Sequence, residues 1–286
     1  MRDDQLRYLV EAVQKGLDWV NSSSVGVEYL PLFADEAFFR DMFLNRHGKK
    51  PNFAVDQWRQ LLLKKLYDTD QLSFDLDITK TDFISRMSTC SDYDILLGLI
   101  YLRQKHGLRT RCYIDDLIRI TKECSRYLFG FLHLYDLMFT FFLEKLGIEV
   151  PFSELNHCDN EPCGIPADVR LMLNYYLATH RILIKSDFLE KELAVGENLN
   201  DMIQELTTAA DWAMNLGYGD LSGEIALCFS MCGLREQLIF ERIIDYLLQT
   251  QGADGAWNFA GYSLRENRHA TYVAILALAE CTCPSG

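Results

Sequence analysis

Residues 247–257 read LLQTQGADGAW, and residues 268–272 read RHATY. The Leu-Leu pair lies near the end of a helix, and the Gly255-x-Trp257 sequence after Gln251 closes that helix with a structured turn. From such a turn the indole of Trp257 can pack back on the preceding helix. This stretch predicts a helical hairpin, to which the rest of the chain adds further helices.

Composition restricts the class of protein. Of the 286 residues, 49% are hydrophobic and 24% are charged, values typical of globular proteins. The net charge of -13 argues against nucleic acid binding, because contact with phosphates requires a cationic surface. No apolar run reaches the roughly 18 residues of a membrane span, and residues 1–13 lack the apolar core of a signal peptide. The nine cysteines are scattered, which favours free thiols in a reducing compartment. We expect a single domain over residues 1–286, located in the cytoplasm.

Apolar residues recur with helical periodicity in nearly every segment. Several of these segments end at a glycine suited to a helix C-cap, among them Gly107 and Gly147. The pattern predicts an all-α protein. We expect eleven helices, near residues 4–20, 33–45, 54–66, 93–106, 113–127, 134–146, 167–181, 200–216, 222–232, 237–250 and 269–281.

Four of these helices share a pattern in which a polar residue leads into a largely apolar helix. The leading residues are Asp94, Asp136, Glu224 and His269. They are separated by 42, 88 and 45 residues, and the second interval equals two steps of 44. A period near 44 residues with two helices each gives room for about six helical hairpins. The apolar helices suit an inner layer and the amphipathic helices between them an outer layer, although a helical solenoid would obey the same spacing.

The spacing of Gln251, Gly255 and Trp257 resembles the Q-x(n)-G-x-W repeat of the terpene cyclase/prenyltransferase-like superfamily of α/α-toroid proteins. The resemblance covers about the last 75 residues. It implies an α/α toroid of about six helical hairpins, with a ring that is closed or incomplete. The catalytic signatures of the known enzymes are absent: residues 75–78 (DLDI) lack the last acid of Asp-x-Asp-Asp, and residues 115–119 (DDLIR) have arginine at the third acid of Asp-Asp-x-x-Asp.

In a toroid the inner helices run roughly parallel, so that their N-termini meet at one mouth. The candidate catalytic residues at this mouth are Asp94, Asp136, Glu224 and His269. Clustered carboxylates and a histidine suit acid/base catalysis, because burial and mutual repulsion separate their pKa values. The candidate substrate-binding tyrosines beside them are Tyr93, Tyr135 and Tyr272. Acids in the first turn also stabilise helices that have no site, and Ser91-x-x-Asp94 fits a capping box, so both interpretations stay open.

Among these residues His269 is the best single candidate, because it opens the last apolar helix after the polar residues 265–268. Its alternative role is a hydrogen bond to the turn at residues 254–258. We also assign substrate contact to His133, one helical turn before Asp136, where a carboxylate could orient the imidazole. A core histidine would show the same spacing. Trp257 either contacts substrate or only stabilises its turn.

A metal site is the weakest possibility in the sequence. His157, Cys158 and Cys163 offer three zinc ligands on an acidic loop, but a fourth ligand is missing and the spacing is uncommon. Glycine-rich phosphate loops and nucleotide-binding fingerprints are absent from the sequence. We therefore predict neither a metal nor a cofactor.

The sequence favours a cyclase-like or isomerase-like enzyme of specialised metabolism. It would apply acid/base chemistry to an apolar small molecule or peptide held in a toroid cavity. One alternative is a non-catalytic helical-repeat protein that binds a peptide or protein partner, in which every acid at the mouth would cap a helix. The other is a toroid polysaccharide lyase or glycosidase, which would expose Trp and Tyr rings beside its site.

Overall fold

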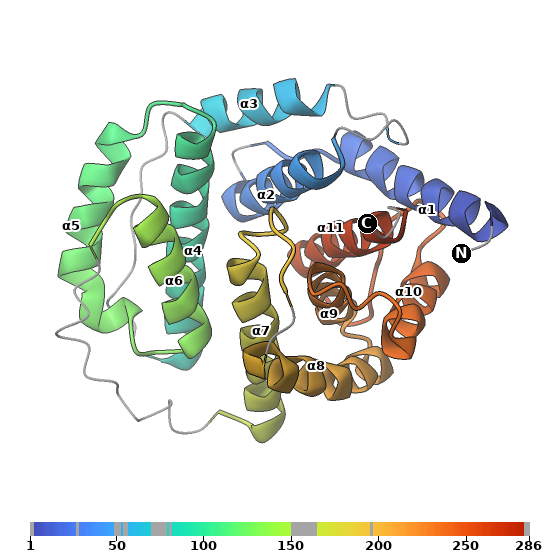
Figure 1. Cartoon of the computed structure of the whole chain (residues 1–286). Coiled ribbons are helices and arrows are strands. Elements are labelled where there is room, and N and C mark those ends of the chain that lie inside the picture. The colour runs from blue at the N-terminus through green and yellow to red at the C-terminus, as the bar shows by residue number, and fades with distance from the viewer. Residues whose placement is uncertain are drawn as a thin grey trace.

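The computed structural model describes residues 3–26, 29–48, 53, 57–69, 79, 82–149, 165–194 and 197–282. Within these residues the regular secondary structure is helical, without a strand, and the prediction of an all-α protein is confirmed. The helices (Figure 1) are α1 (Asp3–Ser22), α2 (Leu30–His47), α3 (Trp58–Asp68), α4 (Phe83–Lys105), α5 (Arg111–Leu128), α6 (His133–Lys145), α7 (Ala167–Lys185), α8 (Glu197–Leu216), α9 (Gly219–Met231), α10 (Leu238–Thr250) and α11 (Leu264–Cys281).

Each predicted helix corresponds to an observed one, and the largest difference in boundaries is at α4. This helix begins at Phe83, ten residues before the predicted start. It begins there because the carboxylate of Asp82 accepts a hydrogen bond from the backbone N–H of Ser85 at 3.0 Å and caps the helix. The capping box predicted at Ser91 and Asp94 is therefore wrong, since both residues lie inside α4.

Six helices pack against one another in a cycle. α2 packs on α4, α4 on α6, α6 on α7, α7 on α9, α9 on α11, and α11 returns to α2. The remaining helices cover these contacts: α1 packs on α11, α3 on α2 and α4, α5 on α4, α8 on α7 and α9, and α10 on α8, α9 and α11. Figure 1 shows α9 and α11 surrounded by α1, α2, α7, α8 and α10.

Helices enclosed by neighbours and helices that cover them differ in sequence, as their positions require. All residues of α9 are buried, and its sequence, GDLSGEIALCFSM, is largely apolar on every side. α5 lies in the covering set and buries only one stripe, which includes Tyr113, Leu117 and Ile120. A helix enclosed by neighbours must be apolar all round, whereas a covering helix needs one apolar face.

The turn at residues 251–257 joins three helices. The indole N–H of Trp257 donates to the carbonyl of Leu247 at 2.7 Å, and its backbone N–H donates to the hydroxyl of Thr271 at 3.0 Å. The side chain of Gln251 donates to the carbonyl of Ala12 in α1 at 2.9 Å. The indole is fully buried, so the turn connects α10 and α11 to α1.

Gly255 in this turn is expected to tolerate no side chain. Its φ is +97°, and a Cβ would overlap the carbonyl oxygen of Lys15. We expect Gly255→Ala to lower the free energy of unfolding by about 2 kcal/mol or more, because it combines left-handed strain with a backbone clash. Urea denaturation measures the change. Gly261→Ala is the control, since φ there is +86° but no atom lies within 4 Å of the added carbon; equal losses in the two variants would contradict the clash.

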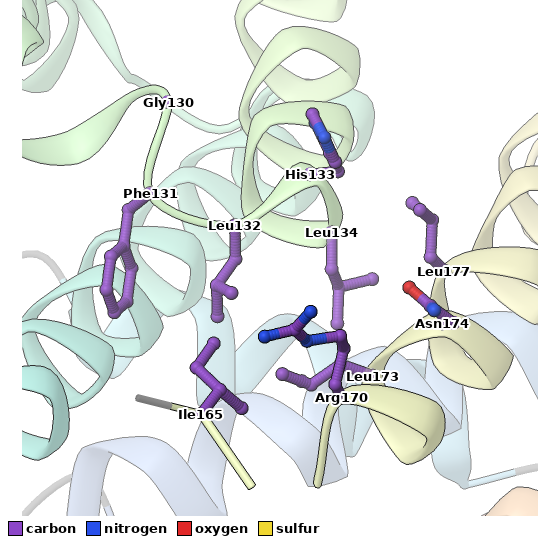
Figure 2. A pocket seen from close by; sticks show the side chains of 10 residues that line it. All are labelled: Gly130, Phe131, Leu132, His133, Leu134, Ile165, Arg170, Leu173, Asn174 and Leu177. Atoms are coloured by element: carbon purple, nitrogen blue, oxygen red, sulfur yellow. The ribbon is translucent and has the colours of Figure 1, made fainter. Parts of the chain in front are cut away.

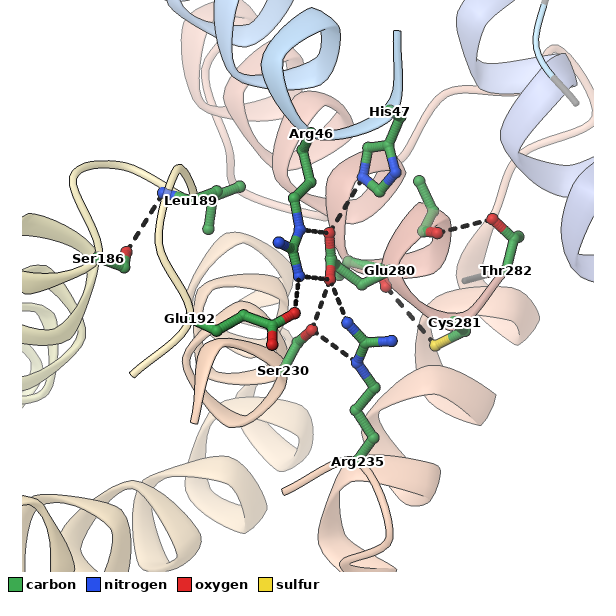
Figure 3. Close-up of polar contacts among 12 residues, drawn as sticks. Arg46, His47, Ser186, Leu189, Glu192, Ser230, Arg235, Glu280, Cys281 and Thr282 are labelled. Carbon is green, nitrogen blue, oxygen red and sulfur yellow. Dashed lines mark hydrogen bonds and ion pairs between the residues drawn. The ribbon is translucent and has the colours of Figure 1, made fainter. Parts of the chain in front are cut away.

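The C-terminal ends of α2, α9 and α11 meet at one buried carboxylate (Figure 3). Glu280 is fully buried and accepts hydrogen bonds from Arg46 at 2.8 and 3.1 Å, from Ser230 at 2.7 Å and from Arg235 at 2.6 Å. His47 lies 3.2 Å from the same carboxylate. We call Arg46, His47, Ser230, Arg235 and Glu280 the Glu280 cluster.

The C-terminal ends of the other three helices lie near this cluster. Lys105 at the end of α4 contacts Asp41 of α2 at 2.8 Å, and Lys145 at the end of α6 contacts Asp187, just after α7, at 2.6 Å. The backbone N–H of Leu193 donates to the carbonyl of Met231, the last residue of α9, at 2.8 Å. The six helices of the cycle therefore share a direction, and the segment after α7 crosses their C-terminal end.

Phe188 holds that segment in place. Its ring is parallel to Phe142 at a centroid distance of 6.0 Å and contacts Phe38 and Phe141. Residues 187–189 all have positive φ, between 51° and 71°, which is costly for residues other than glycine. Burial of the rings of Phe188 and its neighbours stabilises this conformation.

Candidate functional site

A second group of charged and polar side chains, away from the Glu280 cluster, comes from five of the six helices in the cycle. We call them the His269 cluster: Asp35 of α2, Asp94 of α4, His180 of α7, Glu224 of α9, and Arg265 and His269 of α11. Arg265 and His269 lie one turn apart on α11 and therefore face the same side. The cluster contains three of the four residues predicted to be catalytic.

Glu224 is the centre of this cluster. Its carboxylate lies 3.6 Å from the His269 imidazole and 3.5 Å from the His180 imidazole. The hydroxyl of Thr179 donates to it at 2.6 Å. The Glu224 side chain is only 4% exposed, whereas that of His269 is 41% exposed. His269 is thus the accessible member of a histidine–carboxylate pair. Its partner Glu224 is buried and is also contacted by Thr179 and His180.

The pair perturbs both pKa values. Burial alone would lower the pKa of His269. The hydrogen bond to Glu224 and the negative charges of Asp35, Glu224 and Asp220 outweigh burial and raise this pKa from 6.5 to about 9. Burial raises the pKa of Glu224, but its interactions with His180, His269 and Thr179 outweigh burial and lower it. At neutral pH His269 is therefore an imidazolium beside a carboxylate, which makes it a proton donor.

The pKa of Asp94 is raised, whereas that of Glu224 is lowered. Burial raises the pKa of the Asp94 carboxyl to about 7; Arg265 lowers this pKa and Asp35 raises it. One carboxyl oxygen is buried and has no hydrogen-bond partner in the described part of the chain. Arg265 itself is held by Asp35 at 3.1 Å and by the hydroxyl of Ser91 at 3.2 Å. A carboxyl with such a pKa can take up or release a proton near neutral pH.

Asp220 adds a second carboxylate beside this cluster. It accepts hydrogen bonds from the hydroxyl of Tyr176 and, at 2.6 Å, from that of Tyr262. Burial and the charge of Asp220 raise the pKa of both phenols. The two tyrosines therefore stay protonated and donate to Asp220. The negative charge of Asp220 favours the imidazolium of His269.

The other predicted residues lie in different places. Tyr135 is beside Asp94, and its hydroxyl donates to the carbonyl of Met87 at 3.4 Å. The carboxylate of Asp136 accepts from the backbone N–H of Gly130 at 2.9 Å, a local contact at the start of α6 that fits the structural interpretation. His133 is exposed at the first residue of α6.

The remaining three aromatic candidates belong to the hydrophobic core. Tyr93 is fully buried, with its hydroxyl 2.6 Å from that of Thr121. Tyr272 is 2% exposed and accepts from Arg268 at 2.9 Å. Trp257 is buried in the turn described above. Each has the contacts expected of a structural role.

Several residues of the site were not predicted. His180 lies 44 residues after Asp136 and 44 before Glu224, so that the repeat itself would have identified it. Asp35 and Asp220 fit no repeat that the sequence displays. Asp35 joins the cluster because α2 packs on α11, a contact between residues far apart in the chain.

The described residues contain neither a group of metal ligands nor a membrane-spanning helix. Among them no three His, Cys, Asp or Glu side chains converge as ligands of one metal ion. His157, Cys158 and Cys163 lie outside the described ranges. None of the described helices is both long and apolar enough to cross a lipid bilayer.

A pocket lies between the start of α6 and the first half of α7 (Figure 2). Leu132, Leu134, Leu173 and Leu177 supply much of its apolar lining. The polar residues of its lining are His133, Arg170 and Asn174. The figure shows the Arg170 side chain extending between the leucines of the two helices. The prediction that His133 contacts substrate stays open, and the pocket is where it would do so.

Glu224→Gln is expected to return the His269 imidazole toward ordinary behaviour. The variant keeps the shape of the side chain but removes the charge and hydrogen bond that hold the proton. We expect the pKa of His269 to fall from about 9 toward the ordinary value of 6.5. An NMR titration of the imidazole nitrogens measures it. Asp245→Asn, on α10, is the control, and an unchanged pKa in Glu224→Gln would disprove the pairing.

The His269 cluster is the basis on which function can be assigned. No protein-family model matches this chain, and neither a curated protein nor a solved structure matches it.

Proposed function

We propose that this protein is an enzyme that catalyses proton transfer on a small molecule, with the His269 cluster as its active site. The observation that carries the proposal is the presence in one cluster of a carboxyl and an imidazole whose pKa values are both raised. Asp94 has a pKa of about 7, and His269 one of about 9. A carboxyl that ionises near neutral pH can accept a proton, and an imidazolium that keeps its proton above neutral pH can donate one.

We further propose that the helices form an α/α toroid. The closed cycle of contacts from α2 through α4, α6, α7, α9 and α11 supports this architecture. The shared direction of these six helices supports it as well. In a toroid the His269 cluster would lie at one mouth, and the Glu280 cluster would close the opposite end.

The proposed reaction moves one proton onto the substrate and one off it. The ionised Asp94 carboxylate would accept a proton from one atom of the substrate. The His269 imidazolium would donate its N–H proton to another atom, so that a double bond or ring bond shifts and the substrate's composition is unchanged. Exchange with water would then restore both groups. Glu224, Asp220 and Arg265 would position these groups and hold their charges.

The non-catalytic alternative requires every acid at the mouth to serve as a helix cap. Asp136 lies in the first turn of α6 and accepts a hydrogen bond from the backbone N–H of Gly130, just before that helix, which is a local structural contact. Asp94 is the twelfth residue of α4 and Glu224 the sixth of α9, so neither can cap its helix. Asp94 also keeps one buried carboxyl oxygen that has no hydrogen-bond partner in the described part of the chain, a cost that a structural role does not explain. This favours the enzyme.

A sugar-active enzyme is the second candidate. Trp212 and Tyr218 are stacked at 4.9 Å, and Tyr262 lies next to Tyr218 at 6.5 Å while its hydroxyl donates to Asp220. All three rings are partly exposed. Aromatic faces beside carboxylates suit sugars, which combine apolar ring faces with hydroxyl groups.

The test compares wild-type protein with His269→Gln in a small-molecule extract at pH 8. Mass spectrometry follows every compound before and after incubation. We expect the wild type to convert at least one compound to an isomer of equal mass, and His269→Gln to leave it unchanged. Glu192→Gln, whose side chain is 69% exposed on the side of the Glu280 cluster, is the control and should convert normally.

Two results would reject the proposal: no change that depends on the wild-type protein, or equal conversion by His269→Gln. Products that differ from a saccharide by the elements of water would instead favour the sugar-active candidate. The variant is expected to fold, because His269 is accessible and its partner Glu224 keeps His180 and Thr179. Circular dichroism verifies this.

A further inference from the structure

The proposed reaction gives no role to His180, the second histidine of the His269 cluster. Nδ1 of His180 lies 3.5 Å from Oε2 of Glu224, whereas Nε2 of His269 lies 3.6 Å from Oε1 of the same carboxylate. The hydroxyl of Thr179 also donates to Oε2, at 2.6 Å. Because the Glu224 side chain is only 4% exposed, these neighbours rather than water surround its charge. The two imidazoles therefore share one buried carboxylate.

The nitrogen of His180 that faces Glu224 carries a proton. Nδ1 lies 2.9 Å from the backbone carbonyl of Tyr176, one helical turn earlier, and 3.3 Å from the hydroxyl of Thr179. A carbonyl oxygen only accepts hydrogen bonds, so Nδ1 is the donor in this contact whether the ring is neutral or charged. The positive end of this N–H group is thus held close to Oε2 of Glu224.

A donor on one oxygen of a carboxylate changes what the other oxygen can do. Burial raises the pKa of Glu224, and His180, His269 and Thr179 together lower it below its ordinary value. A carboxylate that is stabilised by one neighbour attracts the proton of another neighbour less strongly. His180 therefore reduces the attraction of Glu224 for the proton of His269.

We infer that His180 is a positioning residue that sets the strength of His269 as an acid by engaging the other oxygen of Glu224. The consequence for catalysis rests on the proposed function, whereas the coupling between the two histidines does not. Nδ1 of His269 has no hydrogen-bond partner in the described part of the chain, so this nitrogen would donate to a substrate. On donation the N–H bond at Nδ1 breaks, and the neutral ring keeps its Nε2 proton toward Glu224.

Other titratable groups surround this pair. They are Asp35 of α2, Asp94 of α4, Tyr176 of α7, Asp220 of α9, Arg265 of α11 and Tyr262 just before α11. The helices α6 and α8 also pack on α7, and α1 and α10 pack on α11. No charged side chain of these four helices forms an ion pair with His180, Glu224 or His269 within the residues that the structure describes. A substitution of His180 leaves all these groups in place.

An NMR titration of the imidazole nitrogens tests the coupling, and His269→Gln identifies the signals of His269. We expect His269 to titrate at about pH 9 in the wild type. His180→Phe keeps a ring but has no N–H, so His269 should titrate about 0.5 higher on the pH scale. His180→Asn is the matched variant, because its amide can place an N–H where Nδ1 lies. It should leave the pKa of His269 within about 0.2 of the wild-type value.

A double variant shows whether the effect passes through Glu224. In Glu224→Gln the shared charge is absent, so adding His180→Phe should leave the pKa of His269 unchanged. An equal shift with and without Glu224 would overturn the inference, as would a lower or unchanged pKa in His180→Phe. If circular dichroism shows that His180→Phe does not fold, His180→Leu, which lacks the same N–H, takes its place.

The titration needs no substrate, so it is independent of the proposed function. If His180→Phe raises the pKa of His269 but the wild type converts no compound, the coupling is correct and the proposed function is wrong. If the wild type converts a compound but His180→Phe leaves the pKa of His269 unchanged, the proposed function stands and the coupling is wrong.

Discussion

Glu280→Ala is expected to lower the free energy of unfolding by about 3–5 kcal/mol. Glu280 is fully buried, and its removal leaves Arg46, Arg235 and His47 without their shared carboxylate. The side chains of Arg46 and Arg235 are 17% and 16% exposed, and that of His47 is buried. Removal of a buried carboxylate that pairs with two largely buried guanidinium groups costs more than the lost hydrogen bonds alone. Urea denaturation followed by circular dichroism measures the loss.

Glu192→Gln is the matched control for this loss. Glu192 contacts the same Arg46, at 2.9 Å, but its side chain is 69% exposed (Figure 3). Exposed ion pairs contribute little because water and salt screen them, so we expect a change below about 1 kcal/mol. Similar losses from Glu280→Ala and Glu192→Gln would show that burial of Glu280 does not determine its contribution.

Acid should reduce the advantage of the wild type over Glu280→Ala. Burial alone would raise the pKa of Glu280, but His47 and Arg46 hold it well below the ordinary value of 4.5. A carboxyl whose pKa is lower in the folded state contributes its stability above the unfolded value. The difference between the two proteins should therefore be constant near neutral pH and shrink as the pH falls below 4.5.

The helices could be predicted because their signals are local. The apolar stripe of α1 and the Gln-Gly-Trp turn each lie within a short stretch of sequence. The start of α4 was not predicted, because the first turns of this helix have no buried apolar stripe: Ile84 and Met87 are exposed, and burial begins only at Thr89. The helix begins at Phe83 because Asp82 caps it through the backbone N–H of Ser85.

The site was predictable only in so far as it follows the repeat. The period of about 44 residues identifies Asp94, Glu224 and His269, and one more step would have given His180. Asp35 and the whole Glu280 cluster depend on α2 packing against α11, which lie at opposite ends of the chain. Periodicity cannot predict such contacts, because it describes each helix separately.

The rate of the proposed reaction is expected to follow a bell-shaped pH profile with its maximum near pH 8. The base must be ionised, so the rate should rise through the Asp94 pKa of about 7. The acid must be protonated, so the rate should fall through the His269 pKa of about 9. Asp35, Asp220, Glu224 and Arg265 are the charged neighbours that set these two values. Steady-state rates on the compound found by mass spectrometry measure the profile.

Substitution should remove the two limbs one at a time. Asp94→Asn and His269→Gln should each reduce the rate by about 10²–10⁴, because each lacks one proton-transfer group. The residual activity of Asp94→Asn should lose the acid limb, and that of His269→Gln the alkaline limb. In Glu224→Gln the acid and base both remain, but the alkaline limb should move to lower pH with the His269 pKa. If the alkaline limb stays near pH 9 in Glu224→Gln, the limb does not depend on the His269–Glu224 pair. The assignment of His269 as the acid would then be wrong.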